Sequence, residues 1–137
     1  MKIFIDTSSL IKKYNLEKGT KKVLKIFYEA TEVYVSHITY MEARNTLIRR
    51  YRQKEIISDD LTAAIKLLNN DFSYFSIVPW DESIKNSCIK LIDKHQLKTL
   101  DIIQLGSAIE ASTQLFVTSD KQQHKIAEKE LTNTLLI

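Results

Sequence analysis

Glycine, proline and cysteine are scarce in this chain of 137 residues, which contains 2 glycines, 1 proline and 1 cysteine. So few glycines and prolines exclude collagen-like and low-complexity sequences and argue against a turn-rich β sandwich. Glycine-rich nucleotide motifs are excluded as well, because they need closely spaced glycines, whereas Gly19 and Gly106 lie far apart. The single cysteine, Cys88, excludes an intramolecular disulfide and a cysteine-based zinc site, and it fits a reducing compartment.

Long apolar runs are also missing, and no stretch approaches the roughly 18 residues needed to span a bilayer. Asp6 interrupts the N-terminal apolar run before the core of a signal peptide could form. We therefore expect a cytoplasmic protein with no membrane partner. The net charge of +3 permits a nucleic-acid partner without arguing strongly for one.

The chain has the size of one domain, 1–137, and its hydrophobic fraction of 44% is enough for a buried core. Short apolar runs predict strands at residues 3–5, 33–35, 75–78 and 115–118, with a last short strand at 135–137. Apolar spacing near 3.6 residues predicts helices at 20–30, 36–54, 58–68, 81–92, 99–109 and 120–131. The segment 6–9 is predicted to be a polar turn, and Cys88 to lie in the core.

The strands alternate with helices and are apolar at consecutive positions. This pattern indicates an α/β fold with a parallel sheet that is covered on both faces. In such sheets, ligands bind beyond the carboxyl ends of the strands. The polar residues at those ends are therefore the candidates for a functional site.

Four acids lie at or near these ends. Asp6 and Asp120 follow two predicted strands, while Glu42 and Asp101 lie in the opening turns of predicted helices. We expect these acids to lie at the edge of the sheet rather than in its core. Like charges ~4 Å apart repel by roughly 4 kcal/mol at an effective dielectric near 20, so such a cluster calls for a cation. Ligands that are all oxygen select a hard ion such as Mg²⁺ or Mn²⁺.

Each acid taken singly also has a structural interpretation. Asp120 is suited to a helix N-cap, and Asp101 to a first helical turn, where the helix dipole favours an acid. Asp6 is suited to pairing with backbone groups of a turn, and Glu42 to a solvated helix face. The joint pattern of four acids is what favours a site.

Four stretches of the sequence carry a resemblance to a known family. They are IDTSSL at 5–10, SHITYME at 36–42, LKTLDIIQL at 97–105 and FVTSDK at 116–121. In these stretches the chain resembles the PIN-domain nucleases, and most closely the VapC-type ribonuclease toxins of toxin–antitoxin pairs. The order and spacing of the stretches match that family along nearly the whole chain. Family members often carry glycine after the last helix, whereas here only Asn133 is suited to a left-handed turn.

The resemblance implies a three-layer α/β/α sandwich with a central parallel sheet and a metal-dependent endoribonuclease activity. It implies a catalytic pocket formed by Asp6, Glu42, Asp101 and Asp120. The metal, Mg²⁺ or Mn²⁺, would be held most directly by Asp6 and Asp101. Hydroxyls that support the carboxylates would come from Thr7, Thr118 and Ser119. The products would carry 5′-phosphate and 3′-hydroxyl ends.

Basic residues follow two of the pocket acids along the chain. We expect Arg44, Arg49 and Arg50, which come after Glu42, to contact RNA. A run of lysines follows Asp6, at positions 12, 13, 18, 21 and 22. For both groups, a solvated basic face is the alternative interpretation.

Two kinds of protein partner are expected beside the RNA substrate. The resemblance implies a cognate antitoxin that docks over the pocket. It also favours a homodimer, and Phe27, Tyr28 and Tyr51 supply apolar surface for one.

Three other functions compete with the nuclease interpretation. A haloacid-dehalogenase-type phosphatase would carry a second Asp at position 8, where this chain has Ser8. A response-regulator receiver would carry paired acids after the first strand, and that pair is absent. A PIN-like domain that binds RNA or a partner without cutting it remains open.

Overall fold

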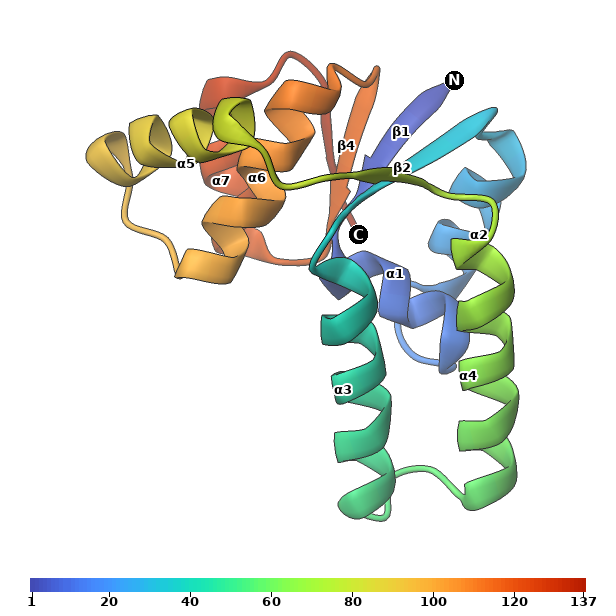
Figure 1. Ribbon diagram of the computed structural model, residues 1–137. Helices are drawn as coiled ribbons and strands as arrows, with labels where there is room; N and C mark the ends of the chain where they lie inside the picture. Colours follow the sequence, from blue (N-terminus) through green and yellow to red (C-terminus); the bar gives the residue numbers. More distant parts are fainter.

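The computed structural model describes all 137 residues and arranges them as five strands and seven helices around one sheet (Figure 1). The elements in chain order are β1 (Lys2–Ile5), α1 (Thr7–Tyr14), α2 (Thr20–Glu29), β2 (Glu32–Ser36), α3 (Thr39–Arg52), α4 (Ser58–Phe72), β3 (Ser76–Val78), α5 (Glu82–Lys94), α6 (Thr99–Ala111), β4 (Leu115–Thr118), α7 (Lys121–Glu130) and β5 (Thr134–Leu136). None of the helices is both long and apolar enough to cross a membrane.

The sheet has the strand order β3-β2-β1-β4-β5, and every neighbouring pair is parallel. The predicted α/β fold with a parallel sheet is confirmed. The chain adds strands on one side of β1 first and then on the other, so the direction of winding reverses between β1 and β4. In open parallel sheets this switch point leaves a crevice beyond the carboxyl ends of the strands, where ligands bind.

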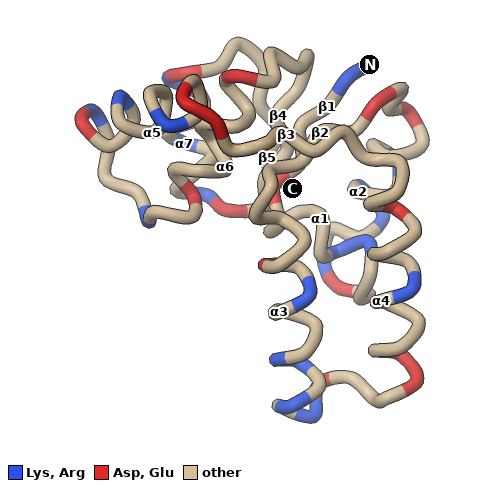
Figure 2. The backbone as a smooth tube through the Cα atoms, viewed as in Figure 1, with Lys and Arg blue, Asp and Glu red and all other residues tan.

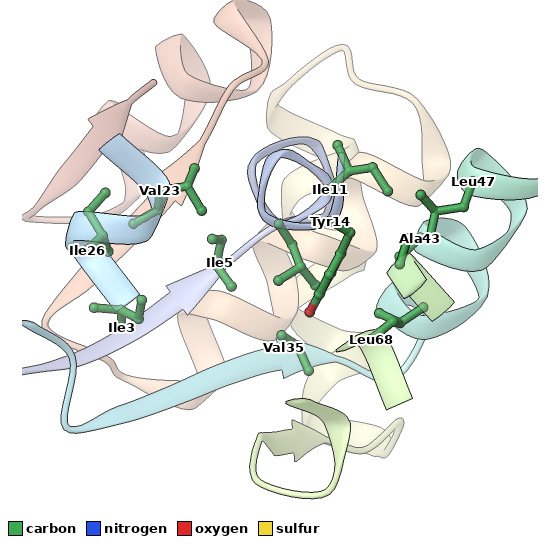
Figure 3. Close-up of a cluster of buried hydrophobic side chains, with 13 residues drawn as sticks. Ile3, Ile5, Ile11, Tyr14, Val23, Ile26, Val35, Ala43, Leu47 and Leu68 are labelled. Carbon is green, nitrogen blue, oxygen red and sulfur yellow. The ribbon is translucent and has the colours of Figure 1, made fainter. Parts of the chain in front are cut away.

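Both faces of the sheet are buried, as the consecutive apolar positions predict. In β1, Ile3 and Ile5 join a cluster of 13 buried residues beneath α1, α2, α3 and α4 (Figure 3). Phe4, between them, points to the other face and joins a cluster of 10 buried residues beneath α5, α6 and α7. Figure 1 shows the two helical layers on opposite sides of the sheet, which makes the three-layer α/β/α sandwich.

Cys88 lies in the second cluster, where it is 5% exposed, so its predicted core position is confirmed. The position of Cys88 also explains why residue 106 is a glycine. A Cβ atom added to Gly106 of α6 would lie 2.7 Å from the Cys88 sulfur, so only glycine allows α5 and α6 to pack this closely.

Helices α3 and α4 form an antiparallel hairpin that extends beyond the sheet (Figure 1). The half near the sheet is held by buried residues such as Ala43 and Leu68 of the first cluster. The far half of α3 ends in Arg49, Arg50 and Arg52. Basic positions accordingly accumulate toward the free end of the hairpin (Figure 2).

The predicted polar turn at 6–9 is wrong, because helix α1 begins at Thr7. The Asp6 carboxylate accepts a hydrogen bond from the Ser9 backbone amide at 3.2 Å, which is the usual contact of a helix N-cap. Three small polar residues suggested a turn, but they form the first turn of a capped helix.

Other element bounds differ by a few residues from those predicted. Helix α3 begins at Thr39 because Ser36 is still part of β2, and α4 continues to Phe72. Strand β5 is Thr134–Leu136, and Thr134 pairs with Phe116. Asn133 is not left-handed, since the only non-glycine residues with positive φ are Lys54 and Ser112.

Candidate functional site

The four acids singled out in the sequence line one open pocket of about 410 Å³. Asp6 directly follows β1, and Asp120 follows the neighbouring strand β4 after one residue. Glu42 comes from the first turn of α3 and Asp101 from the first turn of α6. The fold thus brings four carboxylates from distant parts of the chain to the carboxyl edge of the sheet, at its switch point.

Asp6 is 2% exposed, so it lies inside the edge of the fold rather than on it. Our expectation that all four acids lie outside the core is wrong for this residue. Its carboxylate accepts hydrogen bonds from the hydroxyls of Thr118 and Ser8, both at 2.7 Å, as well as from the Ser9 amide. Burial raises the pKa of Asp6 to about 7, although the three donors act in the opposite direction.

Glu42 accepts hydrogen bonds from two donors, and both reach the same carboxylate oxygen. The hydroxyl of Thr7 and the side-chain amide of Gln104 both donate to Oε1 at 2.7 Å. The same amide nitrogen lies 2.9 Å from the Thr7 hydroxyl and 3.1 Å from that of Thr39. Gln104 therefore fixes Glu42 and Thr7 as one unit.

Asp101 differs from the other acids because no hydrogen bond from the protein reaches its carboxylate. Burial raises its pKa, the charges of Asp120 and Glu42 raise it further, and Lys98 partly offsets them. Asp120 caps helix α7, and its carboxylate accepts from the Gln123 amide at 2.8 Å. Its interpretation as an N-cap is confirmed, and the same side chain also lines the pocket.

The three hydroxyl residues expected to support the carboxylates have different contacts. Thr7 donates to Glu42 and Thr118 donates to Asp6. Ser119 lines the pocket, but its hydroxyl lies 2.8 Å from the Ser9 hydroxyl and touches no carboxylate. Ser119 therefore joins β4 to α1 rather than orienting an acid.

Two glutamines of the pocket were missed in the sequence. Gln104 is 2% exposed and Gln123 is 1% exposed, and both line the pocket. Gln123 donates to the backbone carbonyl of Asp101 at 3.1 Å. The spacing contained a signal, because each glutamine lies three residues after a pocket acid. Gln104 shares a face of α6 with Asp101. Gln123 stands three residues after the N-cap residue Asp120.

The cationic residues divide into two groups. Arg49 and Arg50 line the pocket, whereas Arg44 does not and instead donates to the Tyr40 hydroxyl at 2.9 Å. Arg50 forms an ion pair of 2.7 Å with Glu17, a further residue of the pocket wall. None of the four pocket acids forms an ion pair with a cationic side chain.

The chemistry of this donor set fits a hard cation. The pocket offers carboxylate and hydroxyl oxygens, and Asp6, Glu42, Asp101 and Asp120 have no cationic partner in the protein, although Glu17 on the pocket wall has two. The pKa values of Asp6 and Asp101 are raised. Oxygen ligands of this kind suit a hard ion. As they stand, no three acidic side chains converge on one point. Glu42 and Asp120 are instead engaged by Gln104 and by the amide of Gln123.

Comparisons with known proteins give one family. The family model described as "PIN domain" matches residues 3–129. FitAcB from Neisseria gonorrhoeae superposes with a TM-score of 0.73 at 16% identity over 98% of this chain and 96% of that chain. VapC20 of Mycobacterium tuberculosis, described as a sarcin–ricin loop cleaving toxin, gives a TM-score of 0.69 at 13% identity over 88% of this chain and 92% of that one.

A toxin–antitoxin complex from Klebsiella pneumoniae gives a TM-score of 0.63 at 21% identity and covers 88% of each chain. At these identities the likeness to solved structures is one of fold. No curated protein matches the chain.

Proposed function

The chain belongs to the PIN domain family, and we propose that it is a Mg²⁺- or Mn²⁺-dependent endoribonuclease, the toxin of a toxin–antitoxin pair. The observation that carries the proposal is one pocket lined by four carboxylates, from the end of β1, from α3, from α6 and from the start of α7, none of which has a cationic partner. VapC20, which shares the fold, is described as a toxin that cleaves the sarcin–ricin loop.

Asp6 and Asp101 are the residues that we expect to hold the metal. No donor of the protein is bonded to the Asp101 carboxylate, so metal binding there would break no hydrogen bond. The Asp6 carboxylate is kept in one orientation by the hydroxyls of Thr118 and Ser8. When bound, a divalent ion supplies charge stabilisation of the phosphoryl transition state and lowers the pKa of bound water. Burial raises the pKa of Asp6, so a proton competes with the metal for its carboxylate. We therefore expect the affinity for the metal to rise with pH.

Glu42 and Asp120 complete the pocket from its other walls. Glu42, fixed by Thr7 and Gln104, is placed to accept a proton from an attacking water molecule or to orient it. Asp120 is fixed by its helix cap. Both carboxylates are therefore ordered before substrate arrives, which is the condition for preorganised catalysis.

Arg49 and Arg50 supply the positive charge that a negative pocket needs to attract RNA. They lie on the pocket wall at the far half of α3, and guanidinium groups pair well with phosphate oxygens. Arg44 lies outside the pocket. It would contact RNA only if the bound RNA extended along α3.

The test is cleavage of a structured RNA by the purified protein with Mg²⁺, with Mn²⁺ and with EDTA. We expect cutting with either metal, no cutting with EDTA, and products that carry 5′-phosphate and 3′-hydroxyl ends. RNA binding without cleavage in every metal would support the alternative of a PIN-like binding domain. Activity that EDTA leaves unchanged would contradict a metal-dependent nuclease.

A homodimer and a cognate antitoxin are the proposed protein partners. Several related folds were solved as toxin–antitoxin complexes. Tyr28 is 91% exposed and Tyr51 is 43% exposed, while Phe27 is partly buried and packs against Phe75 within the chain. Sedimentation at tens of micromolar is expected to show a dimer, and a monomer there would remove that part of the proposal.

A further inference from the structure

A second cleft of about 410 Å³ lies where helix α1 passes into α2, and four lysines line it. We call it the lysine cleft, and its lining includes Lys12, Lys18, Lys21, Lys22, Leu16 and Gly19. Lysines 18, 21 and 22 are exposed and form no ion pair with any carboxylate of the chain. The cleft therefore concentrates positive charge that the protein does not neutralise.

The only acidic side chain that lines the cleft, Glu17, is already paired with two cations of the chain. Glu17 accepts from the Lys12 ammonium at 3.0 Å and from the Arg50 guanidinium at 2.7 Å. Burial alone would raise the pKa of Glu17, but these two cations outweigh it and leave the pKa lowered. Lys13, the remaining lysine of this segment, does not line the cleft and pairs with Asp71. Lys12 and Lys13 are thus both paired within the chain, and the three unpaired lysines of the segment, Lys18, Lys21 and Lys22, all line the cleft.

The lysine cleft adjoins the acidic pocket. Lys12 and Glu17 line both cavities and form the wall that the two share. In Figure 2, basic and acidic positions lie side by side in the turn between α1 and α2, beneath the carboxyl edge of the sheet. The two cavities therefore lie on either side of the Glu17 ion pairs with Lys12 and Arg50.

The walls of the cleft suit a nucleotide better than a free anion. Leu16 is 85% exposed and lines the cleft together with the four lysines, so the lining combines apolar and basic side chains. Gly19 has φ +98°, and a Cβ added there would lie 2.8 Å from Cγ2 of Ile137 and 3.1 Å from Cδ of Lys12. The absence of a side chain at Gly19 therefore lets Ile137 and the aliphatic stem of Lys12, both in the lining of the cleft, pack against the backbone.

We propose that the lysine cleft is a second RNA subsite, which binds the phosphates of the single strand that flanks the scissile bond. This inference rests on the proposed nuclease function, because the wall that the cleft shares with the acidic pocket is what favours RNA over other anions. Lysine ammonium groups contact the phosphates, and Leu16 with the lysine stems contacts a base. Glu17 marks the boundary between the two subsites by holding Lys12 and Arg50 in place.

The test compares two triple variants of equal charge change. One is Lys18→Gln/Lys21→Gln/Lys22→Gln in the cleft. The matched control is Lys85→Gln/Lys90→Gln/Lys125→Gln, three exposed lysines without ion pairs on α5 and α7. Binding of a fluorescent single-stranded RNA of about 12 nucleotides is followed by anisotropy in EDTA, where no cutting interferes, over a range of salt concentrations.

The cleft variant is expected to bind RNA at least about tenfold more weakly than wild type at low salt. The slope of log affinity against log salt should also become less negative, by about 0.7 for each phosphate that the variant no longer neutralises. The control variant should retain wild-type affinity and slope within about twofold. All six positions are exposed, and circular dichroism melts should confirm that both variants fold as the wild type does.

Equal weakening in the two variants would mean that only net charge matters, and it would overturn the subsite. An oligoglutamate of equal charge that displaces the RNA as well as unlabelled RNA does would also overturn it, because the cleft would then recognise charge alone. The outcomes separate from those of the proposed function. Lysine-dependent binding without any metal-dependent cleavage would refute the nuclease, and cleavage with unchanged binding in the cleft variant would refute only the subsite.

Discussion

Replacing Asp101 with Asn is expected to reduce metal-dependent RNA cleavage by at least about a thousandfold while the fold survives. A metal ligand contributes several kcal/mol to stabilising the transition state, and each ~1.4 kcal/mol corresponds to a factor of about ten in rate. Asp101 is the cleanest acid to replace, because no hydrogen bond from the protein reaches its carboxylate. Asp6 is a poorer choice, since its replacement by Ala would remove the N-cap of α1 and leave Thr118 and Ser8 without an acceptor.

The stability of the same variant provides a second measurement. The pKa of Asp101 is raised in the folded protein by burial and by the charges of Asp120 and Glu42. Folding therefore favours the protonated form. This contribution to stability is fully present below the unfolded pKa and is lost as pH rises through the folded pKa. Asn cannot ionise, so metal-free Asp101→Asn should be as stable as wild type at acidic pH and more stable above the folded pKa.

Asp93→Asn is the matched control, because Asp93 is exposed on α5 and forms no ion pair. It should cut RNA at the wild-type rate and show the wild-type pH dependence. Urea unfolding at several pH values in EDTA and cleavage with Mn²⁺ give both measurements. An Asp101→Asn protein that cuts as fast as wild type would exclude Asp101 as a metal ligand.

Much of the fold follows from local sequence patterns. Consecutive apolar residues such as Ile3, Phe4 and Ile5 predict a strand buried on both faces, because their side chains alternate between two cores. Helix α1 could not be predicted in the same way. Its first turn, Thr7 to Ser9, has turn-like composition, and an Asp that accepts from a backbone amide also occurs in turns. The helix is distinguished by its backbone bonds, such as that from the Leu10 amide to the Asp6 carbonyl at 3.0 Å.

The candidate site was predictable at its acids but not in its contacts. The position of Asp6 and Asp120 after two strands predicts a common edge only once the strands are known to be parallel neighbours. The burial of Asp6 depends on hydroxyls more than a hundred residues away, such as that of Thr118. Long-range contacts of this kind leave no local pattern, and the pairing of Glu17 with Arg50 was missed for the same reason.

Gln104→Glu is expected to abolish most of the cleavage and to destabilise the protein at alkaline pH. The amide nitrogen of Gln104 lies 2.7 Å from the Glu42 carboxylate, so the variant places a second carboxylate where a donor stood. Two like charges ~4 Å apart repel by roughly 4 kcal/mol at an effective dielectric near 20. The repulsion pushes Glu42 away from the position that Thr7 and Gln104 give it, and proton transfer in the pocket loses its oriented group.

The sign of the pH dependence distinguishes this charge effect from simple loss of a hydrogen bond. The new carboxyl is buried beside Glu42, so its pKa in the folded state rises above the unfolded value of about 4.3. A shared proton restores a donor below that folded pKa, and stability is lost as pH rises through it. Near pH 5 the variant should unfold at a urea concentration close to that of wild type, and near pH 8 at a clearly lower one.

Gln104→Met isolates the hydrogen bonds, because it keeps the volume but removes the amide. It leaves the hydroxyl of Thr39 and the Glu42 carboxylate without their shared donor, at a cost of about 1–3 kcal/mol. Methionine carries no charge, so this loss should be nearly the same at pH 5 and pH 8. Gln114→Glu serves as the charge control, since Gln114 is exposed at the opposite edge of the sheet and a carboxylate there still accepts from the Lys2 amide. If Gln104→Glu and Gln104→Met lose the same stability at both pH values, repulsion between carboxylates does not govern the pocket, and Gln104 acts only as a hydrogen-bond donor.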